Sequence, residues 1–143
     1  MNDCALCGSL SSERTACEIA YEDDLVFCKV NKFPVNEWHV MVLPRRHVET
    51  LEDVTAEELS AMFALINKLT NALMLSVEGK SPLLAMHFGK NKSQKHVHFH
   101  ITSTDHGFRY YYSLAHGKKE YEEASAEELE NMHDRVRALL EEK

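Results

Sequence analysis

The sequence lacks any apolar run close to the roughly 20 residues that a membrane-spanning helix needs. Its start, Met1 to Cys4, also lacks the basic and hydrophobic regions of a signal peptide. We therefore expect a cytoplasmic protein with no membrane partner. Repeats, low-complexity segments and linkers are absent as well, and 143 residues is the size of one domain. The sequence therefore predicts a single domain, 1–143.

Positive charge is in deficit. The chain has 16 lysines and arginines against 23 acidic residues, a formal net charge of −7. Its overall charge therefore does not attract a nucleic-acid backbone or an anionic membrane. A nucleic-acid partner would need a local basic patch, and Lys90, Lys92 and Lys95 form the one candidate, beside a histidine-rich segment. This turn is either an ordinary solvated loop or a site that captures a polyphosphate or nucleic-acid backbone.

Disulfides are not expected, because thiols stay reduced in the cytosol. Of the four cysteines, Cys4 and Cys7 form a C-x-x-C motif followed by glycine. This spacing lets two thiolates in a tight turn coordinate one metal ion. A thioredoxin-like redox pair is the competing interpretation, but that motif follows a strand, and none is predicted before Cys4. Cys17 and Cys28 have no close cysteine neighbour and are interpreted as ordinary small residues.

Histidine, in contrast, is concentrated in one stretch. His96, His98 and His100 alternate with apolar residues, so in a strand they share one face at a spacing of roughly 6.5 Å. One imidazole can then act as a nucleophile while its neighbours bind a phosphate or a metal. A half-buried strand with a polar outer face is the alternative, but histidine is an uncommon choice for that role.

The remaining chain predicts a mixed α and β protein. We expect two short strands within 19–30, an apolar strand at 38–43 that places His39 among core residues, and a further strand within 82–88. Capping boxes at Thr55 and Ser125 predict two helices, a long one ending near Gly79 and a C-terminal one at about 125–142. The segment between the histidine stretch and Tyr121 is predicted to be loop with at most one short strand or helical turn.

The segment from His96 to Thr102 resembles the signature of the histidine triad (HIT) family, three histidines separated by apolar residues. Residues 21–24, 31–34 and 39–49 resemble the N-terminal half of the same family in the same order, so the similarity runs from about Cys4 to Asp105. It implies an α+β fold with an antiparallel sheet of about five strands, one long helix packed on it and a C-terminal helix. It also implies a two-fold homodimer.

Members of this family attack the α-phosphate of a nucleotide. The resemblance therefore implies a small-molecule nucleotide partner and gives His98 the role of a nucleophile that forms a transient nucleotidyl-histidine. It implies that His100 and Ser93 hold phosphate oxygens and that His39 lies beside the triad. The full set of expected site residues is His98, His100 and His39 for catalysis and Ser93, Asn31, Lys92 and Lys95 for binding nucleotide or phosphate.

A subset of the family carries a structural zinc ion. By resemblance its ligands in this chain are Cys4, Cys7, His47 and His96, two thiolates and two imidazoles that make a closed tetrahedral set suited to Zn²⁺. No ligand position remains for a water molecule, so the metal is expected to tie the N-terminus to the sheet and to take no part in catalysis. Reduced cysteines without metal are the alternative.

Three departures from the family pattern leave the substrate open. Asn91-Lys92-Ser93 replaces the common Gly-Gln-Ser, Asn31 replaces an acidic residue that contacts ribose, and Trp38 replaces a glycine. The aromatic–histidine pair at 38–39 resembles the aprataxin branch, which removes adenylate from DNA ends, although its zinc finger is missing. The first hypothesis is a nucleotide hydrolase or transferase, acting on a dinucleoside polyphosphate, a phosphoramidate or an adenylylated molecule. The alternatives are an aprataxin-like enzyme, a nucleotide-binding module with vestigial catalysis, and a zinc protein without nucleotide chemistry.

Overall fold

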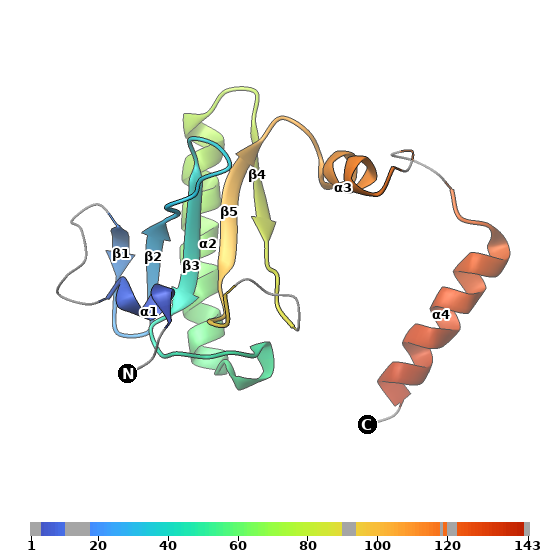
Figure 1. Ribbon diagram of the computed structural model, residues 1–143, viewed down its shortest axis with the longest axis horizontal. Helices are drawn as coiled ribbons and strands as arrows, with labels where there is room; N and C mark the ends of the chain where they lie inside the picture. Colours follow the sequence, from blue (N-terminus) through green and yellow to red (C-terminus); the bar gives the residue numbers. More distant parts are fainter. Residues whose placement is uncertain (1–3, 11–17, 90–93, 118, 120–122, 142–143) are drawn as a thin grey trace. The chain divides into compact units, whose positions relative to one another are not determined.

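The structure is a computed structural model that describes residues 4–10, 18–89, 94–117, 119 and 123–141. The chain divides into two compact units, Met1–His106 and Gly107–Lys143. The first unit contains the sheet and its long helix, and the second contains two helices (Figure 1). That residues 1–143 form a single domain stays a prediction.

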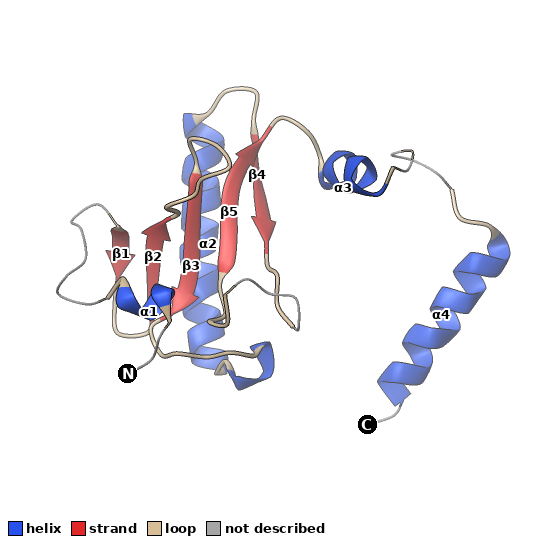
Figure 2. Ribbon diagram, in the orientation of Figure 1, coloured by secondary structure: helices blue, strands red, loops and turns tan. Residues whose placement is uncertain are grey.

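The first unit is built on a five-stranded sheet in which every neighbouring pair of strands is antiparallel (Figure 2). Its spatial order is β1-β2-β3-β5-β4. The strands are β1 (Ile19–Glu22), β2 (Val26–Val30), β3 (His39–Pro44), β4 (Ser81–Ala85) and β5 (Phe99–Thr104). The predicted α+β fold with about five antiparallel strands is confirmed.

The long helix α2 (Ala56–Ser76) begins as its sequence predicts. The Thr55 hydroxyl accepts from the Glu58 amide, and the Glu58 carboxylate accepts from the Thr55 amide, which completes the capping box. The helix ends before Gly79, whose φ of +76° is a conformation that glycine adopts without strain. By length and hydropathy alone α2 is a candidate membrane span, a test that the core helix of a globular domain also passes.

The two faces of the sheet bury different residues. On one face Val26, Val42 and Ile101 pack against Met62 and Ile66 of α2. On the other face Phe27, Met41 and Leu43 pack against Leu6 of α1 (Ala5–Gly8), the short helix of the C-x-x-C segment. The sheet therefore lies between α2 and the N-terminal segment (Figure 1). The second face carries the polar residues described below.

Two predicted elements differ from the structure. The histidine segment was expected to be strand from His96, but β5 begins at Phe99, because the Val97 amide donates to the Val48 carbonyl (2.7 Å) and not to the β3–β5 ladder. The stretch after the sheet was expected to be mostly loop, but Phe108–His116 is a nine-residue helix, α3, that stops at Gly117 with φ +62°. The remaining elements are η1 (Leu51–Asp53) and the expected C-terminal helix α4 (Ala126–Glu141).

Candidate functional site

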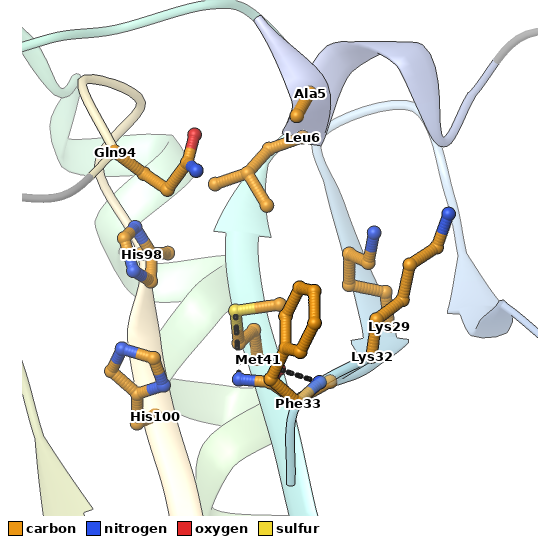
Figure 3. Close-up of a pocket in the computed structure, with 10 residues that line it drawn as sticks. Ala5, Leu6, Lys29, Lys32, Phe33, Met41, Gln94, His98 and His100 are labelled. Atoms are coloured by element: carbon orange, nitrogen blue, oxygen red, sulfur yellow. Dashed lines mark hydrogen bonds between the residues drawn. The ribbon is translucent and has the colours of Figure 1, made fainter.

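A cavity of about 370 Å³ opens on the face of the sheet opposite α2. Three residues expected at the nucleotide site, Asn31, His98 and His100, line it. Figure 3 shows the two histidines on one side of the cavity and two lysines on the other, with Met41 and Phe33 between them. The two lysines are Lys29 and Lys32, and the remaining lining residues are Ala5, Leu6 and Gln94.

Strand register explains this arrangement. Lys29 of β2 pairs with Met41 of β3, and Met41 pairs with His100 of β5. Residues in one such row point to the same face, and neighbouring strands are about 4.8 Å apart. His39 lies two residues before Met41 on the same face, with Asn31 beside it. The sheet thus presents lysine, methionine and histidine across three adjacent strands.

The hydrogen bond made by one ring nitrogen of His98 identifies the other as the nitrogen that keeps a lone pair. His98 Nδ1 lies 2.7 Å from the carbonyl oxygen of His96, and a carbonyl can only accept, so Nδ1 carries the proton. In the neutral ring Nε2 then keeps its lone pair. His98 lines the cavity, so this lone pair is available to a group bound there.

A second chain of hydrogen bonds orients His100. The Val35 amide donates to His39 Nδ1 (3.2 Å), so the proton of neutral His39 is on Nε2. That nitrogen lies 2.9 Å from His100 Nδ1 and in this tautomer donates to it, so the Asn31 amide nitrogen, 3.2 Å away, does not donate to the same atom. Neutral His100 therefore carries its proton on Nε2, and it can donate this proton to an oxygen of a bound phosphate. The ring centroids of His98 and His100 are 4.7 Å apart, so both rings can contact the same bound group.

Burial keeps these imidazoles neutral. It lowers the pKa of His98 and of His39 below the ordinary value. It also lowers the pKa of His100 to about 4, and the neighbouring His98 and His39 act in the same direction. A neutral ring is the form that attacks phosphorus, so the environment favours the reactive form at neutral pH.

The expected metal ligands form a compact group. One ligand atom from each of Cys4, Cys7, His47 and His96 lies within 4.8 Å of the others. Cys7 Sγ is 3.3 Å from Nδ1 of both histidines, and Cys4 Sγ is 3.8 Å from His96 Nδ1. Atoms around a tetrahedral metal at about 2.0–2.3 Å are roughly 3.5 Å apart, so these four residues fit a metal ion.

Hydrogen bonds to residues outside the cluster determine which nitrogen of each histidine is left to bind a metal. His96 Nε2 donates to the Pro44 carbonyl (2.9 Å), and His47 Nε2 faces the Glu49 carboxylate (3.3 Å). Each ring is then left with a lone pair on Nδ1, the atom that points to the thiols. Partners of this kind fix the tautomer of metal-binding histidines in many proteins. The first triad histidine therefore faces the cysteines while the other two face the cavity.

The other expected site residues are placed as follows. Ser93 and Lys92 lie outside the described residues. Lys95 is exposed in the segment before β5 and is not among the lining residues described. Three residues that line the cavity were not predicted as site residues: Lys29, Lys32 and Gln94. A lysine at an inward position of the apolar stretch 25–30 was the signal for the first of these.

Comparison with known proteins agrees with this geometry. The family model described as the HIT domain matches residues 13–107. A bis(5′-adenosyl)-triphosphatase from Dictyostelium discoideum is 31% identical over 132 residues, 87% of this chain and 87% of that protein. An adenylylsulfatase from Arabidopsis thaliana is 29% identical over 102 residues, which are 70% of this chain but only 51% of that protein.

Solved structures share the fold. A histidine triad nucleotide-binding protein from Candida albicans superposes with a TM-score of 0.70 at 21% identity, covering 96% of both chains. A HIT-family protein from Bacillus subtilis gives a TM-score of 0.73 at 19% identity, covering 99% of this chain and 97% of the other. With the family model covering most of the sheet unit and His98 and His100 paired in its cavity, the chain belongs to the HIT family.

Proposed function

We propose that the protein is a nucleotide hydrolase or transferase that works through a covalent nucleotidyl intermediate on His98. The observation that carries the proposal is the orientation of this ring, whose Nδ1 proton is bound to the His96 carbonyl and whose Nε2 lone pair is left for the cavity. Two relatives named as a bis(5′-adenosyl)-triphosphatase and an adenylylsulfatase support a nucleotide substrate.

In the first step His98 Nε2 forms a bond to the α-phosphorus of the nucleotide. The bond from phosphorus to the leaving group breaks, and the leaving group keeps the electron pair. In the second step the oxygen of water, or of another acceptor, forms a bond to the same phosphorus and loses a proton to solvent, the phosphorus–Nε2 bond breaks with its electron pair returning to His98, and the nucleotide is released. His100 Nε2–H donates to a phosphate oxygen throughout, held in place by the hydrogen bond from His39.

We also propose that Cys4, Cys7, His47 and His96 bind a structural Zn²⁺ ion. The donor set of two thiols and two imidazoles, the ligand spacing and the fixed tautomers support this choice. All four protein ligands are used, so the ion ties the N-terminal segment to the sheet and takes no part in the reaction.

A homodimer is the assembly we propose. The edge strand β4 and the outer surface of α2 support it, because both leave large apolar side chains exposed, among them Leu84, Phe63, Met74 and Leu75. Light scattering on the purified protein tests this, and a monomeric mass at micromolar concentration contradicts it.

Detection of the intermediate tests the proposed function. We would mix the protein for milliseconds with adenosine or guanosine 5′-phosphoramidate, quench in alkali to protect the phosphorus–nitrogen bond, and measure the intact mass. We expect a nucleotidyl adduct that is absent in His98→Ala and present in His133→Ala, which changes an exposed histidine of α4. No adduct and no turnover in protein that still binds nucleotide would contradict the enzyme and favour a binding module.

A further inference from the structure

Lys29 is an unexpected side chain for the wall of this cavity. It lies on β2 among buried residues, and only 3% of its surface is exposed, although it lines the cavity together with His98 and His100. A lysine is rarely buried, because removing its ammonium from water costs free energy unless hydrogen-bond acceptors replace the water. Packing alone does not require a charge here, since the neighbouring Met41 and Leu6 are apolar.

The surroundings of Lys29 leave donor capacity for a ligand. Among the described residues its ammonium donates to the Ser9 hydroxyl and lies 3.9 Å from a carboxylate oxygen of Glu18. These two partners use at most two of its three N–H donors. Burial lowers the pKa of Lys29, and the Glu18 carboxylate opposes that effect. The carboxylate therefore helps to keep the wall of the cavity cationic.

The position of Lys29 relative to the histidines indicates which part of a ligand it meets. Lys29, Met41 and His100 form one row across three adjacent strands, so the Cα atoms of Lys29 and His100 are about 10 Å apart across the sheet. Met41 and Phe33 lie between the two sides of the cavity in Figure 3. A nucleotide whose phosphate is at His98 and His100 can extend its base over Met41 and end with the base edge at Lys29.

We propose that Lys29 is a specificity-determining residue that selects the nucleobase, favouring a 6-oxopurine such as hypoxanthine or guanine over adenine. The inference rests on the proposed function, because it assumes a nucleotide phosphate at the triad. It goes beyond that function by naming the substrate class. The relatives reported above are named for adenosine compounds, so this chain is expected to differ from what those names describe.

The physical reason is the match of donors and acceptors in a site that excludes water. The O6 and N7 atoms of a 6-oxopurine are both acceptors, and lysine donates to this pair in many nucleic-acid complexes. Adenine presents an amino donor in place of O6, which would face the ammonium donors of Lys29. Mismatched polar groups cost most when they are buried. A single favourable contact of this kind changes affinity by about tenfold or more.

The test compares inosine and adenosine 5′-monophosphate, which have the same ribose, phosphate and ring skeleton and differ in the group at position 6 of the base and in the proton that hypoxanthine carries on N1. Binding of each to the full chain is measured by calorimetry, in the wild type and in Lys29→Met. We expect the wild type to bind the inosine nucleotide about tenfold more tightly. In Lys29→Met, which keeps an unbranched side chain but has no donor, the ratio of the two affinities should fall to about one.

Lys32→Met is the matched control. Lys32 lines the same cavity and pairs with the same Glu18 (2.7 Å), but its side chain is 62% exposed. We expect this variant to weaken both nucleotides equally and to leave the ratio unchanged. A structural role for Lys29 would likewise move both affinities together, so the ratio separates recognition from folding.

Each outcome decides one question. Equal affinities in the wild type, a preference for adenosine, or an unchanged ratio in folded Lys29→Met would overturn the inference and leave the proposed function intact. If neither nucleotide binds the wild type and no adduct forms on His98, the proposed function fails and this inference fails with it. A tenfold ratio that collapses only in Lys29→Met supports both.

Discussion

The neutrality of His98 has a consequence for the dependence of the reaction on pH. Burial holds the pKa of this imidazole below its ordinary value of 6.5. The His98 ring therefore stays unprotonated down to a lower pH than an exposed histidine does. We expect the rate of adduct formation, measured from pH 7.5 downward, to decline in acid with a midpoint below pH 6.5. Single-turnover rates measured across this range, with an acid midpoint at or above 6.5, would contradict the assigned environment.

The hydrogen bond from His39 to His100 predicts a graded effect of substitution. In His39→Ala the donor is lost and His100 can adopt the wrong tautomer, so we expect kcat to fall by about 10–100-fold with little change in KM. His39→Gln can place an amide donor near the position of Nε2 and should recover part of kcat. His39→Asn, whose amide is closer to the backbone, is the matched control and should not. Equal activity of all three variants would show that His39 does not position His100.

Side-chain identity alone predicted much of this site, but not the side of the cavity opposite the histidines, where Lys29 lies. The alternation of His96, His98 and His100 indicated the chemistry, and the spacing of Cys4 and Cys7 indicated a possible metal site. Lys29 was missed because a lysine in a strand is normally placed at the solvent. Its burial depends on Ser9, Glu18 and the pairing of β2 with β3, contacts between segments whose approach the sequence does not reveal.

At the scale of elements, the start of α2 predicts a measurable stability effect. The Thr55 hydroxyl satisfies the Glu58 amide, and Glu58 also accepts two hydrogen bonds from Arg46. Thr55→Ala removes the cap and should lower the free energy of unfolding by about 1 kcal/mol. Thr55→Ser keeps the hydroxyl and is the control. Urea denaturation of both variants measures the difference, and equal stability would show that the cap contributes nothing.

The elements that the sequence predicted well are those with a strong local pattern. α2 and α4 have capping boxes and apolar residues at helical spacing, and both begin where those patterns place them. α3 was missed because its aromatic residues, Tyr110 to Tyr112 in succession, follow no clear period. The start of β5 was misplaced because the backbone of Val97 bonds to Val48, a tertiary contact that no local pattern encodes.

At the scale of the whole sheet unit, the same two chain segments contribute residues to both the Cys/His cluster and the cavity. Cys4 and Cys7 flank Ala5 and Leu6, which line the cavity, while His96 precedes His98 by two residues. A metal bound by the cluster would therefore join the N-terminal wall of the cavity to the segment before β5 that carries His98. An ion bound there would act on nucleotide binding through position alone, because its ligands differ from the residues proposed to touch phosphate.

Loss of the metal should therefore weaken both the fold and the cavity. We expect about one zinc ion per chain by elemental analysis in the wild type and none in Cys7→Ser. At free zinc 1,000-fold above its Kd, binding contributes about 4 kcal/mol to the free energy of unfolding, which Cys7→Ser should lose. Nucleotide affinity should fall several-fold as Leu6 leaves the cavity wall. Cys28→Ala, which changes a buried cysteine of β2 outside the cluster, should keep both zinc and nucleotide. Full nucleotide affinity in zinc-free Cys7→Ser would mean that the cavity does not depend on the metal.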